Sequence, residues 1–291
     1  MGPISFFKKI RNQHRRNFYL RFSTKKSLNE ASVFERSLLL QYHALEKNLY
    51  QKVPISKART ETLTKQLSYG IEKGFITSNS GVYRIGQDYL KMLSLNKTEH
   101  KGEFSVGIHV FEKTDFLSKN GNALLISRHS VRETSDAEIA PAILFSAFSA
   151  AAKAPSACDR QPCRIIYSLS NSGNQKIKNY VPDRPTIQKM KYALLVVCDR
   201  GLFSDAEDLQ DYVNGGIFVY SLSLSLLSAG LVNCIFQCPL PTNASSAMRK
   251  DLGIREQENA IAFIGFGYPS DSIVVFNSPR LPIEDISRKI D

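Results

Sequence analysis

The 291-residue chain lacks tryptophan and contains only five cysteines. An odd number of cysteines, with no paired C-x-x-C motif, gives no disulfide framework. No histidine stands at zinc-ligand spacing from them, so we expect no structural metal. The sequence is therefore typical of a reducing compartment. We interpret the five thiols as buried structural side chains: Cys158, Cys163, Cys198, Cys234 and Cys238.

The chain also lacks a long uninterrupted apolar run. The longest apolar stretch, residues 216–232, is broken by four serines and is shorter than the roughly 20 residues of a membrane-spanning helix. It is interpreted as a buried helix. Residues 1–16 are basic but contain no apolar h-region and no small-residue cleavage site. With 43% hydrophobic residues, enough to fill a core, the sequence predicts a soluble cytoplasmic protein.

Acidic residues are nearly absent from the first 30 positions. Eight basic residues stand there against Glu30 alone, so this segment carries +7 of the net +11 and leaves +4 for the rest. Two interpretations remain open. We favour a solvated arm that packs its aromatic side chains on its own protein. The alternative is an interfacial helix that makes peripheral contact with anionic lipid. We expect no nucleic-acid partner, because no recognised binding module accompanies the charge.

The first third of the chain has helical periodicity. Residues 33–49 carry apolar side chains at helical spacing, and 56–75 and 84–93 show weaker versions of the pattern. Residues 96–120 are polar and mixed, with a short strand expected over 104–110. The sequence thus predicts a basic arm and a helical extension over 1–120, followed by a second domain over 121–291.

The second domain alternates helices with short apolar strands. Strands are expected over 164–169, 192–198, 233–238 and 260–265. Asp136 is expected to cap a helix that runs through Ala152 with Pro141 in its first turn. Further helices are expected over 208–229, mostly buried, and over 245–252, ended by Gly253. This is an α+β pattern in which a small sheet packs against long helices.

Two adjacent glycines, Gly215 and Gly216, fall inside the expected helix 208–229. A glycine in a helix costs about 1 kcal/mol relative to alanine. The pair therefore predicts that another group approaches this backbone closely.

Three separated segments suggest a phosphorylated ligand with a flat ring. Arg128, Ser130 and Arg132 offer two guanidinium groups and a hydroxyl, which suit a phosphate and a polyhydroxyl chain. Residues 154–162, which include Ala154-Pro155-Ser156 and Gln161-Pro162, form a turn after a helix that can bring backbone amides against a ring. Residues 279–282, Pro-Arg-Leu-Pro, add a further arginine near the end of the chain.

These segments, in this order, resemble the nitroreductase family. The helix-to-strand turn Ala229-Gly230-Leu231 and the strand that ends in Gly267-Tyr268-Pro269 extend the resemblance to about residues 122–285. It implies a nitroreductase-like fold, in which a small, mainly antiparallel sheet is packed by long helices, with the N-terminal helices as an extension. It also implies a homodimer that binds FMN at the subunit interface, with residues 270–291 as an exchanged arm.

By this resemblance, Arg128, Ser130 and Arg132 contact the phosphate and ribityl chain, and Arg280 closes on the phosphate. The residues implied along the ring are Pro155, Ser156 and Ala157 on one side, and Gly230 and Leu231 on the other. His129 lies within the first segment, and we favour packing or backbone bonding over acid catalysis for it. His129, Asp159 and Gln161 are also implied to contact the cofactor. Asp159 stands where the family often has an asparagine at the flavin pyrimidine. Cys163 stands where a tryptophan commonly follows Gln-Pro.

The implied reaction is a ping-pong hydride transfer from NADH or NADPH through the flavin to a small oxidised acceptor. No catalytic side chain is predicted, because the cofactor performs the hydride chemistry. The two departures at Asp159 and Cys163 leave an alternative of another class, a flavin-poor or non-catalytic scaffold.

One further stretch bears on this alternative. His43-Ala44-Leu45-Glu46-Lys47 resembles a His-x-x-Glu-Lys-Gly-Leu stretch of nitroreductase-like proteins associated with surface polysaccharide biosynthesis, with Asn48 in place of the glycine. If this resemblance holds, the helical extension covers the substrate entrance.

Overall fold

The computed structural model describes residues 30–50, 53–95, 106, 121–204, 206–238, 246–271, 273, 275 and 282–290. The basic arm, the segment 279–281 with Arg280, and most of the strand expected over 104–110 lie outside the described residues. The predictions made for these parts of the chain therefore stay predictions.

A four-stranded antiparallel sheet forms the centre of the fold. Its strands are β1 (Cys163–Tyr167), β2 (Tyr192–Asp199), β3 (Val232–Gln237) and β4 (Glu258–Gly267), in the order β1-β2-β4-β3. All four predicted strands exist, with boundaries that differ by a few residues. Every residue of the central strand β2 is buried, because helices cover both faces of the sheet.

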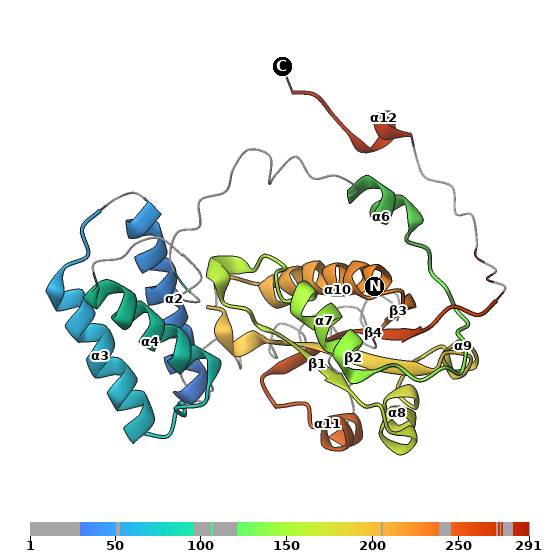
Figure 1. Cartoon of the computed structure of the whole chain (residues 1–291), viewed down its shortest axis with the longest axis horizontal. Helices are drawn as coiled ribbons and strands as arrows, with labels where there is room; N and C mark the ends of the chain where they lie inside the picture. The colour runs from blue at the N-terminus through green and yellow to red at the C-terminus, as the bar shows by residue number, and fades with distance from the viewer. Residues whose placement is uncertain are drawn as a thin grey trace, which may run out of the picture.

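Two pairs of helices sandwich this sheet (Figure 1). Helices α7 (Pro141–Ala151) and α10 (Gln210–Ser228) cover one face, and α8 (Asn171–Lys178) and α11 (Ser246–Leu252) cover the other. Each face of the sheet has its own hydrophobic core. Because successive strand residues point to opposite faces, Leu194 of β2 packs in the core under α7 and α10, and Leu195 packs in the core under α8 and α11. This arrangement confirms the predicted α+β architecture.

Helix α7 corrects one prediction. It begins at Pro141 with Ala140 at the N-cap and no side-chain cap, so Asp136 does not cap it. Proline suits the first helical position because it has no N–H group that would need a hydrogen-bond partner there. Its ring also fixes φ near the helical value. Helices α6 (Gly121–Ser127), α8 and α9 (Arg184–Gln188) were not predicted either. Each has eight residues or fewer, too few to show a clear helical period.

Helix α10 was predicted to be mostly buried, and this is wrong for one of its faces. Val213, Ile217 and Tyr220 are 51%, 40% and 46% exposed. They are spaced by four and three residues and so form a single stripe. Close approach is confirmed at Gly215, where an added Cβ would lie 2.7 Å from the Ile261 side chain. At Gly216, on the exposed side, an added Cβ would meet no atom within 4 Å.

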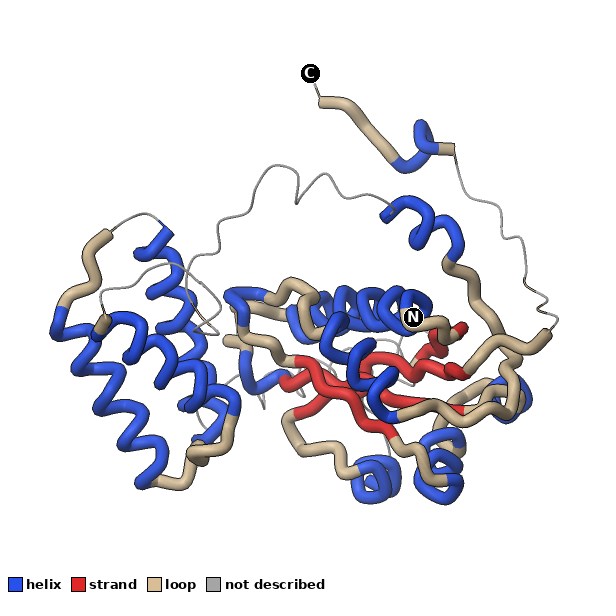
Figure 2. The backbone as a smooth tube through the Cα atoms, in the orientation of Figure 1, coloured by secondary structure: helices blue, strands red, loops and turns tan. Residues whose placement is uncertain are grey.

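The N-terminal helices have a core of their own. Helices α2 (Glu30–Tyr50), α3 (Lys57–Glu72) and α4 (Gly81–Ser94) lie beside the sheet and its helices, as Figure 2 shows. Their fully buried side chains include Leu38, Leu67 and Met92. Ser56 and Ser80 cap α3 and α4 by accepting backbone N–H groups three residues later. The helices of the described part do not combine the length and hydropathy of a membrane span.

Candidate functional site

The arginine-rich segment lies beside the start of β3. The backbone N–H of Val131 donates to the carbonyl of Asn233 at 3.1 Å. Burial raises the pKa of the Cys234 thiol, and the nearby Arg132 guanidinium and a hydrogen bond with Ser130 oppose that rise. The side chains of Arg132 and Ser130 therefore lie close to Cys234 of β3. Arg132 is itself exposed, and its Nη1 donates to the Ser130 carbonyl at 3.2 Å.

The helix-to-strand turn lies at the same place. Gly230 ends α10 with φ +80°, a left-handed conformation that favours glycine, and it is exposed. Leu231 is fully buried in the core, so it lies beneath this turn rather than at its surface. His129 is exposed, and its Nδ1 lies 2.9 Å from the Ser127 carbonyl, consistent with backbone bonding. Five predicted residues thus form a first group: Arg128, Ser130, Arg132, Gly230 and Leu231.

A second group surrounds the short 3-10 turn η1 (Ala157–Asp159). Pro155, Ser156 and Gln161 line a cavity of about 230 Å³ together with Phe148 and Phe218. Its walls include two aromatic side chains and small residues, which suit a flat ring. The other predicted members of this group, Ala157 and Asp159, belong to η1 itself.

The backbone of this turn is strained. Cys158 and Asp159 have φ +51°, and Gln161 has φ +48°. Left-handed conformations are uncommon for residues other than glycine, asparagine and aspartate. Such residues cluster at ligand sites, where the surrounding structure must hold them in place. Two hydrogen bonds help to do so: the Ala157 N–H donates to Asn214 Oδ1 at 2.8 Å, and the Gln161 N–H donates to Ser156 Oγ at 3.0 Å.

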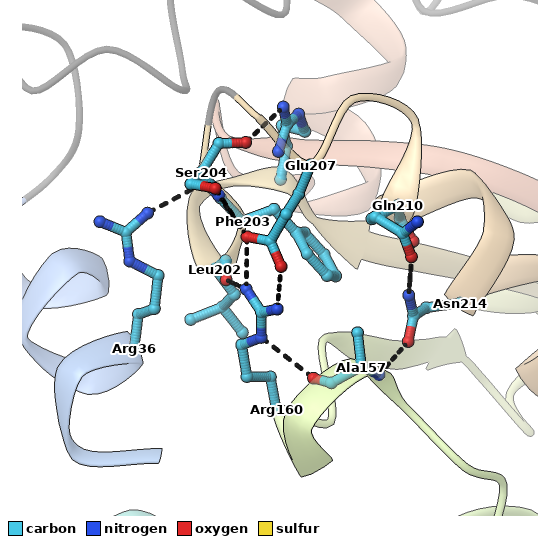
Figure 3. Close-up of polar contacts among 10 residues, drawn as sticks. Arg36, Ala157, Arg160, Leu202, Phe203, Ser204, Glu207, Gln210 and Asn214 are labelled. Carbon is cyan, nitrogen blue, oxygen red and sulfur yellow. Dashed lines mark hydrogen bonds and ion pairs between the residues drawn. The ribbon is translucent and has the colours of Figure 1, made fainter. Parts of the chain in front are cut away.

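Arg160 anchors the turn from inside (Figure 3). Its side chain is 2% exposed, and its guanidinium donates to the carbonyls of Ala157 and Leu202 at 3.0 and 2.7 Å. It also forms a bidentate ion pair with Glu207, and its Cζ lies 4.8 Å from the Phe203 ring centroid. The hydrogen bonds from Arg160 lower the pKa of the Glu207 carboxyl to about 2, against a smaller opposing effect of burial.

Sequence reasoning did not identify Arg160 or Asn214. An arginine in a turn after a helix has the sequence signature of a solvated surface, and its acidic partner lies 47 residues away. Only the adjacent Gly215 pointed to this part of α10. No group of three or more histidine, cysteine, aspartate or glutamate side chains within the described segments is placed to hold a metal ion.

The two groups lie at opposite ends of α10. Asn214 contacts the second group near the start of this helix, and Gly230 belongs to the first group just after its end. At 1.5 Å per residue, the intervening 16 residues correspond to about 24 Å. We call these two groups of predicted cofactor residues the two half-sites.

The half-sites fit the chemistry of FMN in two respects. The first group offers the guanidinium of Arg132 at an exposed glycine turn, which suits a phosphate. The second group offers a narrow, partly aromatic cavity beside a strained backbone. Burial and then the negative charge of Glu46 raise the pKa of the Asp159 carboxyl.

Comparisons with known proteins agree on the fold. No protein-family model matches the chain, and none of the curated proteins matches it in sequence. Among solved structures, a protein from Desulfovibrio desulfuricans described as a nitroreductase in complex with FMN is 18% identical, with a TM-score of 0.52. About 60% of this chain covers 99% of that chain.

Two other solved structures give the same result. A protein from Parabacteroides distasonis described as an NADH dehydrogenase/NAD(P)H nitroreductase is 19% identical, with a TM-score of 0.51, and 59% of this chain covers 98% of it. A protein from Bacillus subtilis described as a nitroreductase is 17% identical, with a TM-score of 0.51, and 62% of this chain covers all of it. The chain therefore has the nitroreductase fold, as its motifs predicted.

Proposed function

We propose that this protein is an FMN-dependent NAD(P)H oxidoreductase that works as a homodimer on a small oxidised acceptor. The observation that carries the proposal is the division of the predicted cofactor residues into two half-sites at opposite ends of α10. A two-fold dimer places the first group of one protomer against the second group of its partner, and so completes two equivalent sites. The fold and the printed descriptions of its neighbours, FMN in one and NAD(P)H in another, support the same chemistry.

The reaction is a ping-pong exchange in which NADH or NADPH reduces the bound cofactor and a second substrate then oxidises it. FMN supplies the hydride chemistry when bound. The chain contributes positive charge from Arg128 and Arg132 toward the phosphate and ribityl groups. Pro155, Ser156 and Ala157 provide a surface for the ring.

The exposed face of α10 supports the dimer. It carries the stripe of Val213, Ile217 and Tyr220, and helix α7, which packs on α10, carries Phe145, which is 54% exposed. Such a patch on a soluble fold marks an interaction surface. Gly216 lies within the stripe and has open space around it, so a partner helix can approach closely there. We take the occupant to be a second copy, because a two-fold contact along α10 also brings the half-sites together.

The C-terminal segment has the character of an arm. Helix α12 (Ile283–Ile286) has no buried residue, and Ile283, Ile286 and Ile290 are 64%, 66% and 88% exposed. Figure 1 shows this segment lying apart from the sheet and its helices. Three exposed isoleucines on a short segment favour burial against a partner. In the proposed dimer they pack on the other protomer.

Ile217→Glu is expected to dissociate the dimer and to lose bound FMN together with it. A charge placed in the centre of an apolar interface is desolvated without a partner. Sedimentation velocity would follow the oligomeric state and the flavin absorbance would follow occupancy. Ile71→Glu is the matched control: Ile71 is 39% exposed on α3, and this variant should stay dimeric and flavin-bound. A dimeric Ile217→Glu variant with full occupancy would contradict the shared site.

The absorbance spectrum of the purified protein with added FMN tests the function itself. We expect a bound-flavin spectrum that bleaches when NADH or NADPH is added under anaerobic conditions. Absence of bound flavin in excess FMN would instead favour the non-catalytic scaffold. The choice between NADH and NADPH follows from which donor bleaches the flavin faster.

A further inference from the structure

A second, larger cavity lies between the N-terminal helices and the sheet domain. It encloses about 510 Å³, within the usual range of small-molecule sites. Arg36 of α2 helps to join the two parts, because its Nη1 donates to the Phe203 carbonyl at 3.0 Å. Helices α2 and α4, turn η1 and the residues just after α7 and η1 contribute the polar and aromatic side chains of its lining. These are Tyr42, His43, Glu46, Tyr89, Lys153, Asp159 and Gln161.

Two carboxylates dominate the chemistry of this cavity. Glu46 comes from α2 and Asp159 from η1, and both line the cavity. The second-largest cause of the raised pKa of Asp159, after burial, is the negative charge of Glu46. The carboxylates therefore repel one another across the cavity. Lys153 and His43 also line it and oppose this repulsion. Glu46, Asp159 and Lys153 together carry a formal net charge of −1.

Glu46 is held in place by its neighbours. The Tyr89 hydroxyl donates to Glu46 Oε1 at 2.8 Å, and His43 Nδ1 lies 3.4 Å from Glu46 Oε2. Tyr89 is fully buried, and burial followed by the charge of Glu46 raises the pKa of its phenol. The phenol is thus a neutral donor that fixes one carboxylate oxygen. The side chain of Glu46 is 40% exposed, so burial does not close it off from a ligand.

The remaining wall is aromatic and aliphatic. The Tyr42 and Tyr89 rings stack with centroids 5.4 Å apart, and Leu39 and Ile85 lie beside them. Tyrosine faces and edges pack on hydrocarbon, and their faces also attract cations. A ligand that suits the cavity therefore combines a positively charged group for the carboxylates with a small carbon skeleton for this wall.

We propose that this cavity binds a small organic cation, an amine whose ammonium group lies between Glu46 and Asp159. Placement between the two carboxylates relieves their repulsion and gives charge-assisted hydrogen bonds. The cavity shares Ala152, Ala154, Pro155 and Gln161 with the cavity of the second half-site. The amine would therefore lie next to the ring of FMN as a substrate. That redox role rests on the proposed function, whereas amine binding does not.

Three probes with one skeleton and different charges test the proposal: cyclohexylamine, cyclohexanol and cyclohexanecarboxylate. Binding is measured by calorimetry at pH 7 on the full chain without added FMN. We expect the amine to bind at least tenfold more tightly than the alcohol, and the carboxylate not to bind. Glu46→Gln and Asp159→Asn should each weaken amine binding about tenfold or more. Both keep the side-chain shape, and asparagine also tolerates the positive φ at position 159.

Two further variants are expected to tighten amine binding and to leave it unchanged, respectively. Lys153→Met removes a positive charge from the cavity, so it should tighten amine binding several-fold. Glu61→Gln changes a carboxylate on α3 that is 56% exposed and pairs with Lys57, and it should leave binding unchanged. Tighter binding of the carboxylate probe, binding of none of the three, or amine affinity unchanged by Glu46→Gln and Asp159→Asn would each overturn the proposal. Because the probes are measured without flavin, these results are independent of the flavin spectrum that tests the proposed function.

Discussion

We expect the Arg128→Ala/Arg280→Ala double variant to lose its ability to retain FMN. Arg128 belongs to the first half-site, and Arg280 belongs to the C-terminal segment that the sequence assigns to the phosphate. A hydrogen bond to a charged group contributes about 1.5 to 3 kcal/mol, so two lost contacts weaken binding by about 10² to 10⁴-fold. Equilibrium dialysis of FMN against each protein, followed by flavin fluorescence, would measure the loss.

The matched control for this variant is Arg59→Ala/Arg84→Ala. Both arginines are exposed, on α3 and α4, and their removal changes the net charge of the protein by the same amount. The control therefore separates a local phosphate contact from a general electrostatic effect, which two lost charges would otherwise share. Flavin occupancy equal to wild type in the Arg128→Ala/Arg280→Ala variant would remove the basis of the cofactor assignment.

The main elements of the sheet domain could be predicted because their signals are local. A strand such as β2 is a continuous apolar run, and α11 ends at Gly253, whose φ is +64°. Short helices such as α9 give no period to read. The Asp136 prediction failed for a related reason: a capping residue was available, but Pro141 five residues later set the start of the helix.

The half-sites illustrate a different limit. Sequence motifs identified which residues suit a phosphate and which suit a ring, but the length of α10 sets how far apart the two groups lie in one chain. That separation depends on where Ala157 contacts the helix, through Asn214, and no local pattern encodes this contact. The exposed stripe of α10 could not be predicted either. A helix that is apolar on all sides has the same sequence pattern whether its own chain covers every face or leaves one face exposed.

The cavity lined by Glu46 and Asp159 could be predicted from the sequence only in part. The sequence singled out His43 and Glu46 as a motif and placed the helical extension over a substrate entrance. It could not show that Asp159 of η1 faces the same space, because the two residues lie far apart in the chain. The resemblance gives Asp159 a role only at the flavin, where it replaces an asparagine. In the structure Asp159 is also close enough to Glu46 for that negative charge, after burial, to raise the pKa of its carboxyl.

The anchor of η1 gives the largest expected effect on stability. Glu207→Ala leaves the guanidinium of Arg160, 2% exposed, without its acidic partner. Removing one partner of a buried ion pair typically destabilises a protein by about 3 to 5 kcal/mol. Arg160→Met combined with Glu207→Ala removes both charges and should recover part of this loss. Urea unfolding of the four proteins of this double-mutant cycle would give the coupling energy. The same measurement on Glu61→Ala, an exposed site, should change stability by less than about 0.5 kcal/mol.

The pH dependence of unfolding separates the ion pair from simple loss of packing. The pKa of Glu207 is about 2 in the folded protein, against an ordinary value of 4.5. A lowered folded-state pKa contributes stability that is fully present above pH 4.5 and is lost as the pH falls toward 2. The difference in unfolding free energy between wild type and Glu207→Ala should therefore shrink between pH 5 and pH 2.5. A difference that stays constant across this range would mean that Arg160 holds η1 by packing and carbonyl contacts rather than through the charge of Glu207.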